Sequence, residues 1–183
     1  MIANLSKAIR CKSCREKFVR QTPWQTACTP ECAVKLVKSK KEKADRKETK
    51  ERKEALKTRS DYMKDAQKAF NAYIRARDAD KPCISCGVDL KREAVGGGFD
   101  CGHYRSVGSA PHLRFDPDNA HGQCKKCNRY LSGNAVEYRR GLFTRLGQTR
   151  LELLEADQCV RKYTIEGLQM IVKDYKRLKR GLE

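Results

Sequence analysis

One stretch of the sequence holds most of the residue types that could do chemistry. Residues 99–130, "FDCGHYRSVGSAPHLRFDPDNAHGQCKKCNRY", contain all three histidines of the chain, three cysteines and two asparagines. Thiolates and imidazoles bind zinc, whereas carboxylate and amide oxygens suit Mg²⁺ or Mn²⁺, and a histidine of near-neutral pKa can accept a proton. The stretch therefore has the groups for a structural metal site, for a hydrolytic site, or for both.

The cysteines indicate two zinc sites. Eight of the ten cysteines form four close pairs, two before and two after the longest charged run. A short pair bends the backbone so that two sulfurs converge on one ion, and four thiolates close its coordination sphere. We therefore expect two structural zinc ions, held by Cys11, Cys14, Cys28 and Cys32 (zinc 1) and by Cys83, Cys86, Cys124 and Cys127 (zinc 2).

The net charge indicates a polyanionic partner. The 183 residues include 41 Lys and Arg against 23 Asp and Glu, which gives +18 and a pI near 9.6. No segment is apolar enough to span a bilayer, and "MIANLSKAIRCKSC" lacks the apolar core of a secretory signal. We expect a cytoplasmic protein that binds nucleic acid rather than a membrane, with the basic residues around the first cysteine cluster as a candidate DNA contact.

The elements that must position these residues divide the chain into four expected parts. Residues 1–37 form an N-terminal four-cysteine zinc module, in which "CTPEC" leads into a helix. Residues 38–77 form a long charged helical linker, since residues 38–59 hold eleven basic and five acidic side chains. From Tyr62 to Ile74 apolar residues recur at helical spacing, so we expect this end of the linker to pack on the domain that follows. Residues 78–135 are the second zinc core, with a hairpin and a short helix, and residues 136–183 are C-terminal helices broken at Gly147, with Thr164 as an N-cap.

The second cysteine cluster encloses an unusually polar insertion. Thirty-seven residues separate Cys86 from Cys124, more than a minimal zinc ribbon needs. A zinc site with a purely structural role would not need so many polar residues of the types that bind metals. They are Asp100, His103, His112, Asn119 and His121.

This layout resembles the HNH, or His-Me finger, nuclease motif. An acid and a histidine on a hairpin, an asparagine ahead of Cys124 and a further asparagine directly after CKKC are similar to phage endonuclease VII, whose motif is also framed by two CxxC pairs. The whole chain resembles the NinG (Rap) recombination proteins of lambdoid phages more closely still. The resemblance implies an α+β fold with a zinc-braced ββα-metal, treble-clef-like nuclease core.

The resemblance also implies roles for four residues. His103 would be the general base that activates water, and Asn119 would orient His103 by a hydrogen bond. Asp100 and Asn128 would ligate one catalytic Mg²⁺ or Mn²⁺. In "DCGH" the acid and the histidine are separated by two residues, although they adjoin in the usual motif, so we expect a bulge at Gly102 that brings them together.

Three other residues of the stretch have structural alternatives. We expect His112, which follows Pro111 in a loop, at the surface or against a phosphate rather than on a metal. His121 either orients the catalytic site or supports the zinc knuckle. Cys101 is expected to pack in the core, although it lies close enough to the motif to be a ligand.

The function implied by the resemblance is that of a structure-specific, metal-dependent endodeoxyribonuclease. It would cut Holliday junctions and D-loops as a homodimer in the bacterial host cytoplasm, alongside recombination proteins. The alternative is a non-catalytic, zinc-dependent protein that binds branched or duplex DNA. An RNA-directed nuclease is a third hypothesis, although no RNA-specific stacking motif is visible.

Overall fold

A computed structural model describes residues 8–90 and 98–183 of the chain. The chain divides into two compact units, Met1–Lys57 and Thr58–Glu183. Helices and two small antiparallel sheets occur together, which confirms the α+β class. The four expected parts, with their limits at residues 37, 77 and 135, stay predictions.

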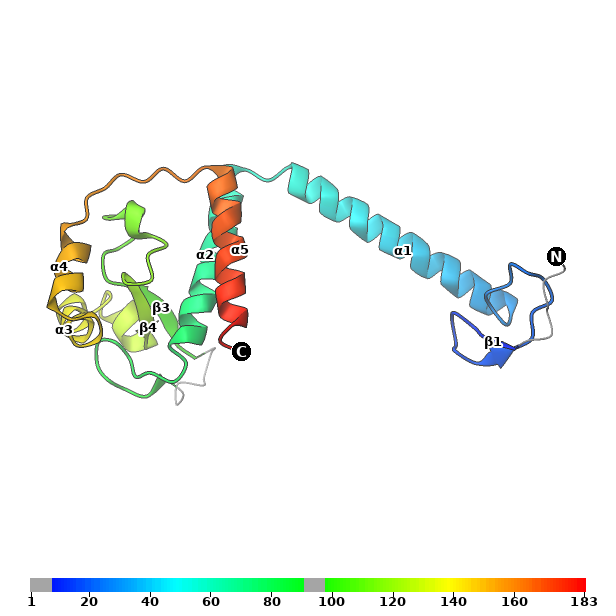
Figure 1. The fold of residues 1–183 in the computed structure, drawn as a ribbon, viewed down its shortest axis with the longest axis horizontal. Coiled ribbons are helices and arrows are strands. Elements are labelled where there is room, and N and C mark those ends of the chain that lie inside the picture. Colours follow the sequence, from blue (N-terminus) through cyan, green and yellow to red (C-terminus); the bar gives the residue numbers. More distant parts are fainter. Residues whose placement is uncertain (1–7, 91–97) are drawn as a thin grey trace. The chain divides into compact units, whose positions relative to one another are not determined.

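The N-terminal unit consists of a small hairpin and one long helix (Figure 1). Strand β1 (Ile9–Arg10) pairs with β2 (Lys17–Phe18), and α1 extends over Pro30–Ala55. The side chain of Thr29 caps α1 by accepting a hydrogen bond from the N–H of Cys32 (3.3 Å), and Pro30 lies in the first turn, where its missing N–H costs nothing. The expected start of a helix within "CTPEC" is therefore confirmed.

The long charged stretch is divided between two helices. None of the side chains of α1 is buried, and ion pairs such as Glu48 with Arg52 (2.6 Å) connect successive turns. Leu56 is the C-cap of α1, and Thr58 is the N-cap of α2 (Arg59–Arg77). The N–H and the hydroxyl of Thr58 both donate to the carboxylate of Asp61. This cap belongs to the second unit, so the expected linker 38–77 is shared by both units.

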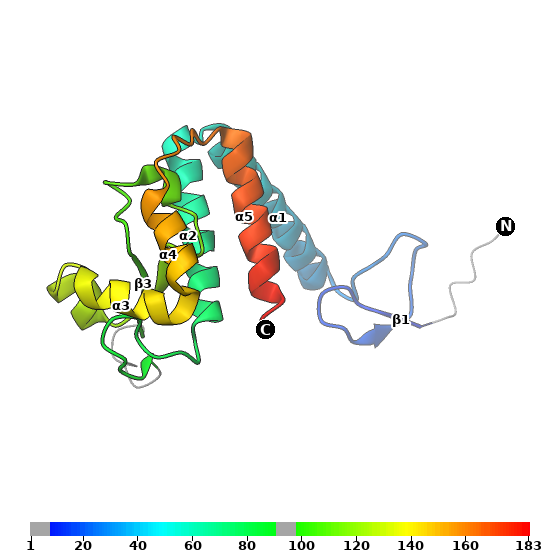
Figure 2. The same cartoon turned by 60° about the vertical axis from the view of Figure 1, so that its left-hand side comes forward.

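In the C-terminal unit, a two-stranded antiparallel sheet lies between two pairs of helices. Strands β3 (Asp100–His103) and β4 (Ala120–Gln123) are flanked by α2 and α5 (Ile165–Arg180) on one side and by α3 (Ala135–Leu146) and α4 (Gln148–Ala156) on the other (Figures 1 and 2). Gly147, at φ 78°, separates α3 from α4, and the hydroxyl of Thr164 caps α5. Both expectations are confirmed.

Two apolar clusters hold these helices to the hairpin. Helix α2 buries the apolar face that its helical spacing predicted, and α5 contributes Leu168 to the same cluster. The second apolar cluster joins α3 and α4 to Ile84, which lies between the zinc-site residues Cys83 and Cys86, and to η2 (Pro111–Leu113), a 3₁₀ turn. The buried members are Ala66, Phe70, Ile74, Phe115, Ala120 and Leu168 in the first cluster, and Ile84, Ala110, Leu113, Tyr138, Leu142, Leu151 and Leu154 in the second.

The hairpin register corrects the expectation of a bulge at Gly102. Four consecutive pairs, from Asp100 with Gln123 to His103 with Ala120, are regular. Gly102 is needed for another reason, because a Cβ at this position would clash with the side-chain oxygen of Gln123. In a regular strand, side chains three residues apart point to opposite faces, so Asp100 and His103 do not share a face.

The zinc knuckles are joined to this scaffold by close backbone contact. A Cβ at Gly141 would overlap the carbonyl oxygen of Ile84, so only glycine lets α3 pack against the first knuckle of the second cluster. The second knuckle leads into η3 (Lys126–Tyr130), a π-helical turn. Among the helices of the described ranges, none is both long and apolar enough to cross a membrane.

Candidate functional site

The first cysteine cluster fits a tetrahedral zinc ion. Its four sulfurs all lie within 4.8 Å of one another. The Sγ of Cys28 lies 3.5 Å from that of Cys14 and 3.7 Å from that of Cys32. A tetrahedral ion with Zn–S bonds of about 2.3 Å separates its sulfurs by about 3.8 Å, so these distances suit one zinc ion without rearrangement of the chain.

The local backbone favours a thiolate in this cluster. The Sγ of Cys11 accepts hydrogen bonds from the N–H groups of Ser13 and Cys28, each at 3.4 Å. Burial alone would raise the pKa of Cys11, but hydrogen bonds from the backbone N–H groups of Cys14, Cys28 and Ser13 outweigh burial and lower it to about 6. A deprotonated sulfur is the form that binds zinc, and N–H donors of this kind stabilise a metal-bound thiolate.

The second cluster has the same geometry in a more buried setting. Its four sulfurs also lie within 4.8 Å of one another, and those of Cys86 and Cys124 are 3.7 Å apart. The N–H of Cys124 donates to the Sγ of Cys83, and the N–H of Cys127 donates to that of Cys124, both at 3.4 Å. Two four-cysteine clusters compatible with structural zinc are therefore present, as the spacing predicted.

Asp100 lies beside Asn128, as the motif predicted, but it also pairs with a residue that the sequence did not single out. The Nδ2 of Asn128 donates to Oδ2 of Asp100 (3.0 Å), and Nε and Nη2 of Arg129 donate to the two carboxylate oxygens (2.7 and 3.0 Å). Burial would raise the pKa of Asp100, but the bonds from Arg129 and Asn128 leave it below its usual value. Arg129 thus supplies the positive charge that compensates the Asp100 carboxylate.

His103 lies on the other face of the hairpin, toward α2. Its ring centroid is 5.8 Å from that of Phe70, and its Nε2 lies 3.0 Å from the carbonyl oxygen of Arg114. Because a carbonyl only accepts, we assign the proton to Nε2. Burial lowers the pKa of His103, which keeps the ring neutral at pH 7.

Asn119 contacts the loop that follows β3 instead of His103. Its buried side chain accepts from the N–H of Arg105 (2.8 Å) and donates to the carbonyl oxygens of Arg105 (3.0 Å) and Leu113 (3.2 Å). These bonds fix the loop that also carries Arg114, the partner of His103. The side chain that was expected to bond His103 directly therefore reaches it through this loop.

The other three residues of the stretch have structural surroundings. His112 is buried, contrary to the surface position expected, because its Nε2 bonds the carbonyl oxygen of Asp157 (2.9 Å). Cys101 packs against the α2 cluster as expected, and burial raises its pKa to about 12. His121 lies in a polar cluster: its Nδ1 is 2.9 Å from Nη2 of Arg77 and 3.4 Å from Nη1 of Arg145, and its Nε2 is 3.2 Å from the carbonyl oxygen of Asp118.

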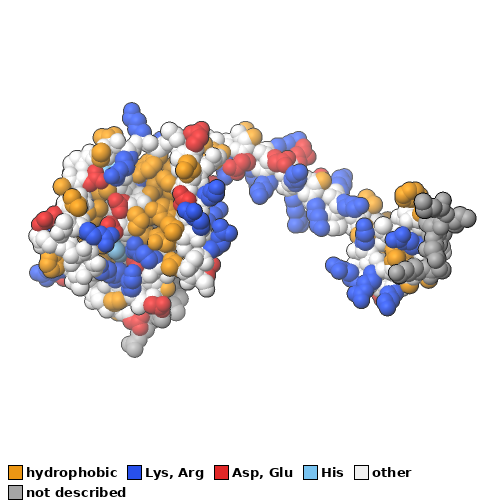
Figure 3. Space-filling view, viewed as in Figure 1, with side chains coloured by type: hydrophobic (Ala, Val, Ile, Leu, Met, Phe, Trp, Pro, Cys, Tyr) orange, Lys and Arg blue, Asp and Glu red, His pale blue; other side chains and the backbone are white. Residues whose placement is uncertain are grey.

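A basic groove, which no single motif predicted, borders the first cysteine cluster. It has a volume of about 390 Å³ and lies between the first knuckle and α1. Five cations and no acidic side chain line it. Figure 3 shows how Lys and Arg side chains gather over this unit. The lining residues are Arg10, Cys11, Lys12, Arg15, Leu36, Ser39, Lys40 and Lys43.

Comparisons with known proteins place the chain beside bacteriophage proteins. The family model described as "Bacteriophage Lambda NinG protein" matches residues 3–183. "Protein ninG" of Escherichia phage lambda and of Salmonella phage P22 are each 42% identical to the chain, and that of Escherichia phage 933W is 41% identical. Each alignment covers 92% of this chain and 90% of the relative. No solved structure matches.

These comparisons correct the function expected from the sequence. Neither the family description nor the names of the relatives give a nuclease activity. The prediction of a structure-specific endonuclease that cuts Holliday junctions and D-loops is contradicted and therefore wrong. The alternative, a zinc-dependent protein that binds nucleic acid without cutting it, is compatible with the comparisons.

Proposed function

We propose that this chain, which belongs to the bacteriophage NinG family, is a zinc-dependent nucleic-acid-binding protein. The observation that supports this most directly is the basic groove beside the first cysteine cluster. Five cations around one groove form a site of strongly positive potential, and the phosphate backbone is the polyanion that such a site attracts. DNA is the proposed partner, and the host cytoplasm the proposed location.

The groove also gives zinc a direct part in binding. Cys11, a ligand of zinc 1, lies in the groove wall next to Arg10 and Lys12. The ion would fix the knuckle that carries these cations, while α1 holds Lys40 and Lys43 on the opposite wall. Removing zinc is therefore expected to weaken binding by disordering one wall of the groove.

A charge-matched pair of double variants tests this proposal. Lys40→Gln with Lys43→Gln removes two cations from the groove, and Lys47→Gln with Lys50→Gln removes two cations elsewhere on α1. We expect the groove variant to bind a duplex oligonucleotide at least about tenfold more weakly, with the slope of log K against log salt reduced by about two. Fluorescence anisotropy over a salt series measures both quantities.

The control separates a defined groove from general positive charge. The Lys47 and Lys50 variant has the same net charge and is expected to stay much closer to the parent in affinity. Equal losses in the two variants would show that the groove has no special part in binding. A zinc-loaded parent that binds no oligonucleotide at low salt would disprove the proposed function altogether.

A separate proposal is a metal-dependent endodeoxyribonuclease activity, to which no branched substrate is assigned. Two features support it: the contact between Asp100 and Asn128, and the order of β3, β4 and η3 around the second cluster. A ββα-metal core like that of HNH nucleases and endonuclease VII would have this order. Mg²⁺ or Mn²⁺ on Asp100 and Asn128 would have to displace Arg129.

Nicking of a supercoiled plasmid tests this second proposal. The activity is expected to need Mn²⁺ or Mg²⁺ and to fall at least about a hundredfold in Asp100→Asn. Asp174→Asn, which changes an exposed carboxylate that pairs with Arg177, is the control. A protein that binds the plasmid and leaves it intact with either ion excludes cleavage and leaves the binding function standing.

A further inference from the structure

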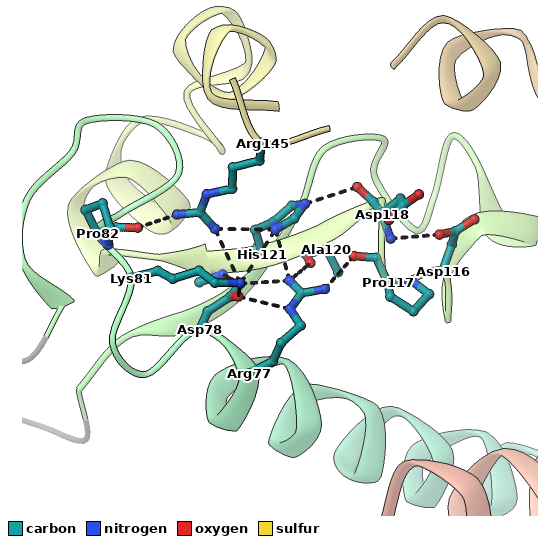
Figure 4. A network of polar contacts seen from close by, with 12 residues as sticks. Arg77, Asp78, Lys81, Pro82, Asp116, Pro117, Asp118, Ala120, His121 and Arg145 are labelled. Atoms are coloured by element: carbon teal, nitrogen blue, oxygen red, sulfur yellow. Dashed lines mark hydrogen bonds and ion pairs between the residues drawn. The ribbon is translucent and has the colours of Figure 1, made fainter. Parts of the chain in front are cut away.

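A second cluster of charge lies at the end of α2, in the C-terminal unit. At its centre Asp78 is fully buried, and its carboxylate meets Arg77 (2.8 Å), Lys81 (2.9 Å) and Arg145 (3.5 Å). Oδ2 also accepts from the N–H of Gly122 (2.9 Å). Figure 4 shows the three cations converging on this one carboxylate, with His121 beside them.

Arg77 is the structural member of this cluster. Its Nε and Nη2 donate to Asp78, its Nη1 donates to the carbonyl oxygen of Pro117, and Nη2 also donates to that of Ala120. Nearly all of its five N–H groups are therefore engaged within the protein. Arg77 joins α2 to the start of β4 and has little left to offer a ligand.

Among the described residues, Lys81 and Arg145 differ from Arg77 because their bonds leave donors to spare. The Nζ of Lys81 makes a 2.9 Å bond to Asp78, and its side chain is 46% exposed. Arg145 donates through Nη2 to the carbonyl oxygen of Pro82, and its Nη1 lies 3.4 Å from His121 and 3.5 Å from Asp78. An ammonium has three N–H groups and a guanidinium five, so these bonds use only part of each cation.

These two cations line an open pocket of about 290 Å³. The other lining residues are Arg77, Asp118, His121 and Leu146. Asp118 is neutralised by a two-pronged bond from Arg150 (2.6 and 3.2 Å to its two oxygens). Burial lowers the pKa of Arg145, which indicates that Asp78 alone does not replace the water this guanidinium has lost.

The charges of the described residues that line the pocket, taken together with their ion-pair partners Asp78 and Arg150, therefore do not balance. Arg77, Lys81, Arg145 and Arg150 carry four positive charges, against two negative charges on Asp78 and Asp118. His121 does not change this balance, because its Nδ1 faces two guanidinium groups and so accepts, which makes the ring neutral. An excess of two charges with unused N–H donors is the arrangement that binds an anion with several oxygens.

We infer that this pocket binds a backbone phosphate of the nucleic acid through Lys81 and Arg145. The inference rests on the proposed function, since it names a second contact point, in the C-terminal unit, for the same polyanion. Asp78 holds the two ligand-binding cations in place, so that their side chains lose little freedom when a phosphate binds. Two contact points in two units would let one chain hold a longer stretch of backbone than the groove alone.

Neutral variants of the two cations test this inference in the full-length, zinc-loaded protein. Lys81→Gln and Arg145→Gln are each expected to bind a duplex oligonucleotide about tenfold more weakly, with the slope of log K against log salt reduced by about one. Arg177→Gln removes an equal charge from the exposed surface of α5 and is expected to change affinity less than twofold. Zinc content and thermal unfolding show that each variant is folded.

Each outcome of this test decides the inference. Lys81→Gln is decisive if Arg145→Gln does not fold, because the ammonium is half-exposed and makes one 2.9 Å bond to Asp78. Suppose that the parent binds, that the groove variants bind more weakly, and that the pocket variants match Arg177→Gln. The assignment of the pocket as a phosphate site is then wrong, and the proposed function stands. If the parent binds no oligonucleotide, both fail.

Inorganic pyrophosphate distinguishes a free phosphate ligand from a backbone. Pyrophosphate is expected to compete with the oligonucleotide for the parent more strongly than for Lys81→Gln. If pyrophosphate instead raises the unfolding temperature of the parent but not of Lys81→Gln, while both bind the oligonucleotide equally, the site serves small phosphates and the assignment to nucleic acid is overturned.

Discussion

Replacing Cys124 by serine is expected to remove one of two zinc ions and to abolish cooperative thermal unfolding of the C-terminal unit. The apolar cluster around this site consists of Leu90 and three of the zinc ligands themselves, with Phe99 packed against it. Without the ion, mutual repulsion and burial of the thiolates would oppose this packing. Structural zinc contributes about 10–16 kcal/mol in small domains, as much as the whole stability of a typical domain.

The measurement combines zinc content per chain with calorimetry, and the chain supplies its own controls. Cys159→Ser changes an exposed cysteine outside both clusters and is expected to keep two zinc ions and the parental unfolding temperature. Cys28→Ser is expected to lose zinc from the N-terminal unit alone, so that the transition of residues 58–183 remains. Two zinc ions and an unchanged transition in Cys124→Ser would contradict the second zinc site.

The sequence predicted those features that depend on neighbouring residues. Each cysteine cluster is assembled from short pairs, so the spacing of the cysteines along the chain largely determines which sulfurs come together. The first turn of α1 follows from Thr29 and Pro30, and the break between α3 and α4 follows from Gly147, whose positive φ favours glycine. The buried face of α2 was visible as helical periodicity.

Features that depend on strand register and on distant partners were not predictable in this way. Asp100 and His103 looked like one site in "DCGH", but a regular register places them on opposite faces. His112 looked like a loop residue, yet its partner is a carbonyl 45 residues away. Arg129 was a local signal that sequence reasoning missed, because it directly follows Asn128 and can reach the same carboxylate.

The Asp78 cluster was missed for the same physical reason. Asp78 and the N–H group of Gly122 are 44 residues apart, and Arg145 lies further along the chain. An Arg-Asp pair at the end of a charged helix has no distinguishing pattern in a sequence so rich in charge. Only the fold shows that this aspartate is buried while most other acidic residues are exposed.

Asp78→Asn is expected to destabilise the C-terminal unit by about 3–5 kcal/mol at pH 7, because it leaves Arg77 and its neighbours without the carboxylate that compensates their burial. The amide keeps the volume of the side chain and one oxygen for the N–H of Gly122, so the loss reports on charge. Asp174→Asn, at an exposed ion pair, is expected to cost less than about 1 kcal/mol. Urea unfolding of the three proteins measures these differences, and a loss below about 1 kcal/mol in Asp78→Asn would contradict a central role for this carboxylate.

The pH dependence of the difference in unfolding free energy between the parent and Asp78→Asn separates the effect of charge from the effect of packing. Burial would raise the pKa of Asp78, but the hydrogen bonds from Arg77 and Lys81 and the positive charge of Arg77 place it well below the usual value. A carboxylate with a depressed pKa in the folded state stabilises fully above its unfolded pKa, near 3.9, and loses that contribution as the pH falls further. Burial lowers the pKa of His121, and removing Asp78 would lower it further, so the ring is neutral in both folded proteins at pH 7 and the gap measured there reports on Asp78. The gap is therefore expected to hold between about pH 5 and 8 and to shrink below about pH 4, whereas a packing defect would leave it constant.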